Sequence, residues 1–220
     1  MPSFRYENRC AEAGAVRIAG IDEVGRGPLA GPVVAAVALI DRAGAKRRLL
    51  RLIDDSKKLT LEEREEAYEA MLASGAVRYA VGEASVEEID AINILQATFL
   101  AMRRALAGLA APPDIVLIDG NRVPPELGCR AETIVGGDAR SYSIAAASII
   151  AKVTRDRYMR ALAPAFPGYG WETNVGYRSA VHLAALNRLG PTAHHRRSFA
   201  PVMLALEPGL PLEDLPLDES

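Results

Sequence analysis

The sequence is poor in cysteine, in long apolar runs and in histidine, and each shortage excludes a class of protein. The two cysteines, Cys10 and Cys129, lie far apart and match no metal-binding spacing, which indicates free thiols in a reducing compartment. No apolar run approaches the roughly 18 residues that a membrane span requires, and the polar first residues contain no secretory signal. We therefore expect a cytoplasmic protein without membrane contact.

The chain has only three histidines. His194 and His195 precede two arginines, but no cysteine or third histidine is close enough in the sequence to complete a zinc pattern. We favour helix capping or a phosphate contact for this pair over metal binding, and a packing or surface position for His182.

Aromatic residues make up 5% of the chain, so Leu, Ala, Val and Ile must fill the interior. Half of the 220 residues are hydrophobic, which is enough for a sizeable core. This length fits one large domain, or one domain with an appendage.

The net charge of −2 argues weakly against a nucleic-acid partner, but the acidic residues are unevenly distributed. Residues 207–220 contain five of them and no basic residue; removing these five charges changes the net charge from −2 to +3. The same segment is rich in proline and is expected to be disordered. Basic residues cluster elsewhere, and each cluster by itself predicts a solvated surface: Lys57 with Lys58, Arg155 with Arg157, and Arg196 with Arg197.

The pattern of apolar and turn residues predicts an α/β architecture with a mixed sheet. Strands are expected at 16–24, 32–40, 76–85, 113–120 and 132–138. Helices are expected after two capping boxes, Thr60 with Glu63 and Ser85 with Glu88, and at 141–162, 177–189 and 198–206. Small residues on one face of 141–162 suit close packing on a sheet, and the single tryptophan, Trp171, is expected in a loop with a packing role. No long crossover separates the first strands, so they can pair as hairpins.

Four carboxylates follow apolar segments: Asp22 and Glu23 end the first strand, Asp119 ends VLID, and Asp138 comes after ETIVGG. A charge in a buried strand is costly unless it is paired or bound to a metal, and sites in open α/β sheets form at the carboxyl ends of strands. Oxygen ligands without a nearby His or Cys suit Mg²⁺ or Mn²⁺.

Two alternatives remain open for these residues. An ordinary Asp-Gly turn explains Asp119 by itself as well as a metal does. Adjacent strand residues point to opposite faces, so Asp22 and Glu23 can share a site only if the strand ends or distorts there, which the following glycines permit.

The segment GRGPLAG at 25–31 differs from a dinucleotide-binding loop. Its third glycine comes one residue late, and the strand-like PVVAAV replaces the helix that such a loop requires. Its closely spaced glycines instead favour close approach of a ligand backbone to the main chain.

Six segments, in order, resemble the bacterial ribonuclease HII family (type 2 ribonuclease H): IDEVGRGPLAGPVVAAVAL, DDSKKLT, EIDAINILQATFLAM, VLIDGNR, SIAAASIIAKVTRDRYM and GPTAHHRRSFAPV. The resemblance extends from about residue 16 to 204. It implies a ribonuclease H-like fold, a five-stranded mixed sheet flanked by helices with a C-terminal helical extension. We accordingly expect a catalytic domain at 16–164, a substrate-binding extension at 165–206 and the tail at 207–220. Residues 1–15 show no periodicity and are expected to form a loose arm.

The resemblance also implies an activity. Members hydrolyse the RNA strand of RNA/DNA hybrids and cut on the 5′ side of ribonucleotides embedded in duplex DNA, using two divalent ions, Mg²⁺ or Mn²⁺. The family's catalytic and metal-binding carboxylates fall on Asp22, Glu23, Asp119 and Asp138. We expect a monomer whose partners are these nucleic acids.

The family's substrate-binding motifs fall on three places in this chain. Its Gly-Arg-Gly motif, which senses a 2′-hydroxyl, matches Gly25, Arg26 and Gly27. Its Asp-Ser-Lys-Lys motif places Ser56, Lys57 and Lys58 near phosphate. The tyrosine that stacks on the sugar past the junction matches Tyr177.

Two departures from the family pattern remove a positive charge near the expected substrate path. Gly136 and Val175 stand where the family usually has lysine, which puts phosphate affinity in doubt more than the chemistry. Asp156 is an alternative fourth ligand, although its neighbours Arg155 and Arg157 favour a surface ion pair.

Two other functions remain to be weighed. A module that binds hybrids without cutting them gains nothing from four carboxylates beside phosphate. A nucleotide-binding oxidoreductase depends on the Gly-rich turn alone.

Overall fold

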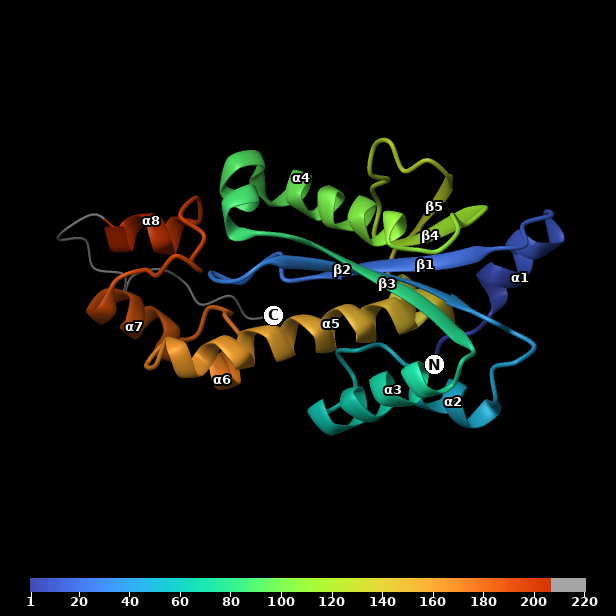
Figure 1. The fold of residues 1–220 in the computed structure, drawn as a ribbon, viewed down its shortest axis with the longest axis horizontal. Helices are drawn as coiled ribbons and strands as arrows, with labels where there is room; N and C mark the ends of the chain where they lie inside the picture. The colour runs from blue at the N-terminus through green and yellow to red at the C-terminus, as the bar shows by residue number, and fades with distance from the viewer. Residues whose placement is uncertain (207–220) are drawn as a thin grey trace. The chain divides into compact units, whose positions relative to one another are not determined.

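The computed structural model describes residues 1–206 (Figure 1). They form two compact units, each assembled from separate stretches of chain: the sheet unit consists of 1–24, 34–83 and 98–154, and the helical unit consists of 25–33, 84–97 and 155–206. The expected contiguous division at 164/165 stays a prediction. The tail expected at 207–220 lies outside the described residues.

A five-stranded mixed sheet forms the centre of the sheet unit, as expected. Its strands are β1 (Ile18–Val24), β2 (Val33–Ile40), β3 (Val77–Ala84), β4 (Ile115–Asp119) and β5 (Arg130–Ile134), in the order β3-β2-β1-β4-β5. β1 pairs antiparallel with β2, as the short connection predicts, and β4 is parallel to both β1 and β5.

The last strand was expected at 132–138 but ends at Ile134. Gly136 adopts a left-handed conformation with φ of 64°, which turns the chain into the short 3-10 helix Gly137–Ala139. A β-strand cannot continue through that backbone conformation. Asp138 therefore lies in a turn beyond the strand.

The expectation of a loose arm at 1–15 is wrong, because α1 forms over Arg5–Glu12. The carboxylate of Glu7 is buried and accepts hydrogen bonds from Ser141 Oγ at 2.6 Å and from Ser143 N at 3.0 Å. Cys10 packs in an apolar cluster with Ile18 and other residues of the sheet. Contacts distant in sequence stabilise α1, which explains why local periodicity does not show it.

The other helices of the chain before residue 163 are α2 (Arg47–Leu52), α3 (Leu61–Ala73), α4 (Val86–Ala107) and α5 (Tyr142–Leu162). Sequence reasoning did not predict α2. Both expected capping boxes are present: Glu63 N donates to Thr60 Oγ1 at 3.2 Å, and Glu88 N to Ser85 Oγ at 3.3 Å. The main chain breaks inside α4 at Asn93, whose φ is 66°.

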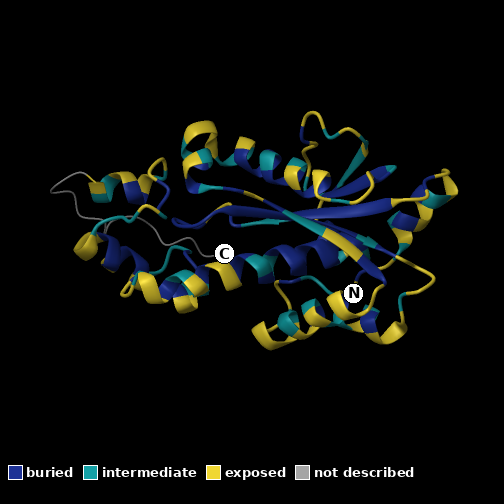
Figure 2. Cartoon of the chain, in the orientation of Figure 1, coloured by how far each residue is buried: buried dark blue, intermediate teal, exposed yellow. Residues whose placement is uncertain are grey.

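Close packing of α5 on β1 forms much of the core, and Figure 2 shows the central strands and the inner face of α5 as buried. A methyl group on Gly20 would lie 2.2 Å from the carbonyl carbon of Ser143. Small residues on α5, including Ala145, Ala146 and Ala147, permit this approach. The expectation that this helix presents small residues to a sheet is confirmed.

The helical unit contains α6 (Trp171–Asn174), α7 (Ala180–Leu189) and α8 (Ala200–Leu206). Trp171, expected in a loop, starts α6 and is fully buried, so the packing role expected for it is confirmed. α7 starts three residues later than the expected 177 because Ser179 Oγ caps it, accepting from His182 N at 3.1 Å. None of the helices in residues 1–206 combines the length and apolar character needed to cross a membrane.

Candidate active site

Asp22 and Asp119 lie at the same edge of the sheet because β1 and β4 run parallel, with Ile21 paired to Ile118. The Asp22 side chain is buried, and Asp22 Oδ1 accepts a hydrogen bond from Glu23 N at 2.7 Å. Burial, followed by the negative charges of Glu23 and Asp119, raises the pKa of Asp22 well above its ordinary value. The fold therefore holds a carboxylate in a place that favours a nearby cation.

The turn after β5 adds a third carboxylate. Gly137 N donates to Asp119 Oδ1 at 2.6 Å, and the next residue, Asp138, is buried. Burial raises the pKa of Asp119, and the charge of Asp138 adds to it, while the Gly137 N–H and the Lys57 ammonium act in the opposite direction. A methyl group on Gly137 would lie 2.5 Å from Ile144 Cδ1, so a larger residue there would have to displace the end of that side chain.

Lys57 extends its ammonium group among these carboxylates. Its Nζ lies 3.6 Å from Asp138 Oδ2, and its side chain is otherwise 83% exposed. Desolvation acts to lower the pKa of Lys57, but the charges of Asp138, Asp22, Asp55 and Asp119 outweigh it and raise that pKa. Lys57 therefore places a positive charge near several carboxylates.

Ser148, on α5, is a site residue that sequence reasoning missed. Its hydroxyl hydrogen-bonds the carboxylate of Asp22, and Ser56 Oγ lies 2.8 Å from Ser148 Oγ. An ionised carboxylate only accepts hydrogen bonds, so the Ser148 hydroxyl donates to Asp22 and the Ser56 hydroxyl donates to Ser148. Ser56 was expected to contact substrate, whereas the structure buries its hydroxyl behind Asp22.

Glu23, next to Asp22 on β1, is only half-buried. β1 continues through it to Val24, with Glu23 opposite Ala35, so the strand does not end at the Asp22–Glu23 pair. Within residues 1–206 no three His, Cys, Asp or Glu side chains meet closely enough to hold a metal ion as they stand. The donor set consists of carboxylate oxygens, on the buried Asp22 and Asp138 and on the half-buried Glu23 and Asp119. Such oxygens nevertheless have the chemistry that Mg²⁺ and Mn²⁺ favour.

Gly25, Arg26, Gly27 and Tyr177, which are also predicted to bind substrate, lie in the helical unit, and Lys58 lies in the sheet unit. Gly25 is buried with φ of 90°, while Arg26 and Gly27 are exposed. Leu29 N, four residues along the same loop, donates to Gly176 O at 2.9 Å. This contact brings the loop beside the segment that contains the half-buried Tyr177. Lys58 pairs with Asp55, their charged atoms 3.6 Å apart.

The basic pairs were expected on a solvated surface, and in two of these pairs the expectation is wrong for one arginine. Arg155 and Arg196 are fully buried, whereas Arg157 and Arg197 are exposed. Asp156 is also buried, and its Oδ2 lies 3.8 Å from Arg160 Nη2, so the expectation that it lies on the surface is wrong.

The interpretation of His195 as a cap or phosphate ligand is also wrong, because it is buried against His182, with the two Nε2 atoms 3.0 Å apart. His182 Nδ1 lies 2.9 Å from Tyr177 O and must donate to it. His182 Nε2 therefore accepts, from Trp171 Nε1 at 3.3 Å and from His195 Nε2. His195 Nδ1 accepts from Thr192 N at 2.9 Å. Both rings are neutral in this arrangement.

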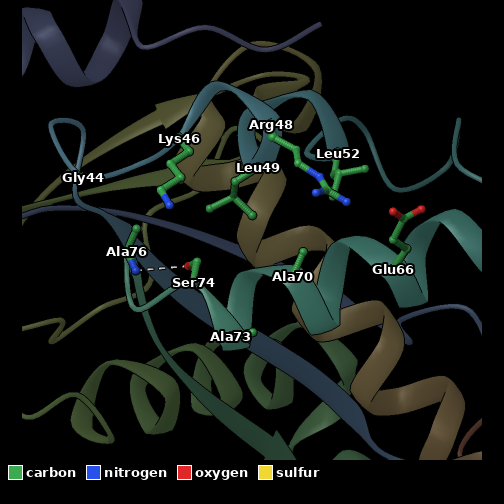
Figure 3. Close-up of a pocket in the computed structure, with 10 residues that line it drawn as sticks. All are labelled: Gly44, Lys46, Arg48, Leu49, Leu52, Glu66, Ala70, Ala73, Ser74 and Ala76. Atoms are coloured by element: carbon green, nitrogen blue, oxygen red, sulfur yellow. Dashed lines mark hydrogen bonds between the residues drawn. The ribbon is translucent and has the colours of Figure 1, made fainter.

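A hollow of about 320 Å³ lies between α2 and α3, away from the carboxylates (Figure 3). Leu49, Leu52 and Ala70 give it apolar walls, and Lys46 and Arg48 add basic groups. None of the predicted catalytic or substrate-binding residues lines it, so it does not contribute to the candidate active site.

Known proteins of one family are similar to this chain over most of its length. The profile of a family described as ribonuclease HII matches residues 19–202. A ribonuclease HII from Rhodospirillum rubrum is 60% identical over 206 residues, covering 94% of this chain and 92% of that protein. A ribonuclease HII from Paramagnetospirillum magneticum is 59% identical, covering 92% and 97% of the two chains.

Solved structures show the same fold. The ribonuclease H2 of Pyrococcus horikoshii superposes with a TM-score of 0.70 at 28% identity, over 86% of this chain and 97% of that one. The ribonuclease HII of Archaeoglobus fulgidus, solved in complex with PCNA, has a TM-score of 0.65 at 28% identity, over 91% and 100%. The chain belongs to the ribonuclease HII family of ribonuclease H enzymes, endonucleases that act on RNA in RNA/DNA hybrids.

Proposed function

We propose that this enzyme cuts the RNA strand of RNA/DNA hybrids, and cuts duplex DNA on the 5′ side of an embedded ribonucleotide, with divalent cations held by Asp22, Glu23, Asp119 and Asp138. Two bound Mg²⁺ or Mn²⁺ ions would supply an activated water and stabilise the leaving oxygen. The carboxylates of Asp22 and Asp119 carry the proposal: they lie at the same ends of two paired parallel strands, and burial, together with neighbouring negative charge, raises the pKa of each.

The residues of the sheet unit have separate roles in this proposal. Asp22 and Asp119 offer ligand oxygens from two parallel strands, and Asp138 offers a third from the turn after β5. Ser148 orients the Asp22 carboxylate through its hydroxyl. Glu23 would complete the set through a distortion of the main chain near the end of β1, where Gly25 follows with φ of 90°, since adjacent residues of a strand point to opposite faces.

Substrate recognition is assigned to three groups. Main-chain groups of Gly25, Arg26 and Gly27 bond the 2′-hydroxyl, which distinguishes RNA from DNA at one position. Tyr177 packs on the following sugar, where a second 2′-hydroxyl would clash. Lys57 and Lys58 face phosphate, and contacts limited to phosphate and sugar make recognition independent of sequence.

The proposed function also leads to expectations about phosphate binding, oligomeric state and location. Gly136 and Val175 leave two positions without the positive charge that is usual in the family, so we expect weaker phosphate binding with unchanged chemistry. We propose that the enzyme acts as a monomer in the cytoplasm.

Substitution of Asp22 tests the catalytic assignment. Asp22→Asn should leave less than about a tenth of wild-type cleavage at saturating Mg²⁺, because loss of a carboxylate that would hold the metal removes more than about 1.4 kcal/mol of transition-state stabilisation. Asp41→Asn is the matched control: Asp41 also directly follows a strand, but it is exposed. Retention of higher activity by Asp22→Asn, with a fold unchanged by circular dichroism, would exclude Asp22 as a ligand.

A further inference from the structure

Two fully buried arginines of the helical unit bond main-chain carbonyl groups of one loop. Arg155 Nε donates to Pro32 O at 3.0 Å, its Nη2 to Ala30 O at 2.9 Å, and its Nη1 to Val175 O at 3.0 Å. Burial lowers the pKa of Arg155. A buried cation is costly, so the three carbonyl bonds are needed to offset the loss of hydration.

Arg196 bonds the other carbonyl groups of this loop. Its Nη1 donates to Arg26 O at 3.0 Å and its Nη2 to Gly25 O at 2.5 Å. Its Nε and Nη2 both donate to Gly31 O, at 2.9 and 2.8 Å, and Nη2 also lies 3.2 Å from Pro32 O. The planar guanidinium fork can donate in several directions at once, whereas a lysine ammonium cannot match this geometry.

These bonds fix the direction of the amide groups in the Gly25-Arg26-Gly27 motif. In a trans peptide the N–H points opposite to the C=O of the preceding residue. Because the carbonyls of Gly25 and Arg26 point at Arg196, the N–H groups of Arg26 and Gly27 point away from it. Both of these residues are exposed, and a methyl group on Gly27 would have no neighbour within 4 Å.

The two glycines of the motif therefore have different structural roles. A methyl group on Gly25 would lie 2.3 Å from Arg155 Nε and 2.8 Å from Pro32 O, and its φ of 90° is strained for other residues. Gly25 permits the buried arginine to pack against the loop. Gly27 instead leaves space on the exposed side.

Arg155 also reaches the tyrosine segment. Its guanidinium carbon lies 5.4 Å from the centre of the Tyr177 ring, within the range of a cation–π contact. Its bond to Val175 O fixes the main chain two residues before that ring. One side chain thus connects the loop and the aromatic ring.

We propose that Arg155 and Arg196 are specificity-determining positioning residues, which hold the amides of Gly25-Arg26-Gly27 and the ring of Tyr177 at the separation that recognises a ribonucleotide followed by a deoxyribonucleotide. This inference rests on the roles proposed above for the loop and for Tyr177. Neither arginine touches the reacting atoms, and neither contributes to metal binding.

The test compares Arg155→Lys and Arg196→Lys with the wild type on a duplex holding one ribonucleotide and on a continuous RNA/DNA hybrid. Lysine keeps the charge but loses most of the carbonyl bonds. The ratio of kcat/KM between the two substrates should fall at least about tenfold, because each misplaced donor weakens recognition of one hydroxyl. Calorimetric Mn²⁺ binding should be unchanged. Arg157→Lys and Arg197→Lys, at exposed neighbouring positions, are the matched controls and should keep the wild-type ratio.

Equal losses on both substrates, or a lost Mn²⁺ signal, would overturn the inference. If neither lysine variant folds, NMR of the wild type decides: the Nε–H protons of both arginines should stay protected from exchange when the single-ribonucleotide duplex is bound, and rapid exchange would overturn the inference. A different result would contradict the proposed function itself: a wild-type enzyme that cuts neither substrate, or that cuts the hybrid but not the duplex at its single ribonucleotide.

Discussion

The negative charges near Asp22 have to be balanced by a cation whether or not a metal is bound. In the structure that cation is the ammonium group of Lys57, whose Nζ lies 3.6 Å from Asp138 Oδ2. The surrounding carboxylates raise the pKa of Lys57. A mobile side chain can leave when a divalent ion enters. The lysine and the metal are therefore expected to compete for the same carboxylates.

Lys57→Gln should lower the melting temperature of the metal-free protein and leave that of the protein in saturating Mg²⁺ almost unchanged. Without the ammonium group the carboxylates repel one another, and bound metal relieves that repulsion. Differential scanning calorimetry with EDTA and with Mg²⁺ measures both values.

Lys58→Gln is the control for this prediction, because Lys58 pairs with Asp55 and lies outside the carboxylate group. It should change both melting temperatures by the same small amount. An identical effect of Lys57→Gln with and without Mg²⁺ would show that Lys57 does not balance the site.

Sequence reasoning found the residues whose chemistry conflicts with their surroundings. Asp22 and Asp119 stand out because each ends a run of apolar residues. Ser148 does not, since a serine among alanines on a helix is typical of close packing. Arg155 lies four residues after Ala151 and four before Met159, both buried, and this helical spacing was the available signal that it points inward.

At the scale of elements, the pairing of His182 with His195 connects α7 to the segment that precedes α8. Burial, with the charges of His182 and His194, lowers the pKa of His195 from 6.5 to about 3. Burial also lowers the pKa of His182. Either ring gains a proton in the unfolded chain at a higher pH than in the folded protein.

The stability of the helical unit should therefore fall as pH decreases from about 6.5 toward 3. In that window the unfolded state binds a proton at His195 that the folded state does not, which contributes a slope of about 1.4 kcal/mol per pH unit. His182 adds to the loss in the same direction. Urea unfolding at about pH 7 and about pH 5, followed by fluorescence of Trp171, measures the loss. The only tryptophan of the chain contacts both rings.

His195→Gln provides the comparison for this pH dependence. It should lose about 2 kcal/mol less than the wild type between the two pH values, since its amide does not titrate. The same loss in both proteins would mean that His195 is accessible to protons in the folded state.

Elements with strong local signals were predictable. The two capping boxes and the small-residue face of α5 follow from short-range rules, and the structure confirms them. α1 and the early end of β5 were not predictable in this way. The first depends on the buried bonds of Glu7 to Ser141 and Ser143, and the second on one left-handed glycine.

At the scale of the whole molecule, the chain order of the carboxylates does not indicate which of them meet. The parallel pairing of β1 with β4 brings Asp22 and Asp119 together from positions about 100 residues apart. The mixed sheet was predictable from the order of the elements and from the family resemblance. The division into a sheet unit and a helical unit, each built from three stretches, was not predictable, because it depends on contacts between segments distant in sequence.

Cleavage of a DNA duplex that contains one ribonucleotide, with and without Mg²⁺ and with products mapped to the nucleotide, tests the central claim most directly. The proposed site predicts one cut, on the 5′ side of the ribonucleotide, that leaves a 3′-hydroxyl and a 5′-phosphate and requires the divalent ion. Tight binding without cleavage, cleavage that persists in EDTA, or a cut on the 3′ side of the ribonucleotide would contradict it.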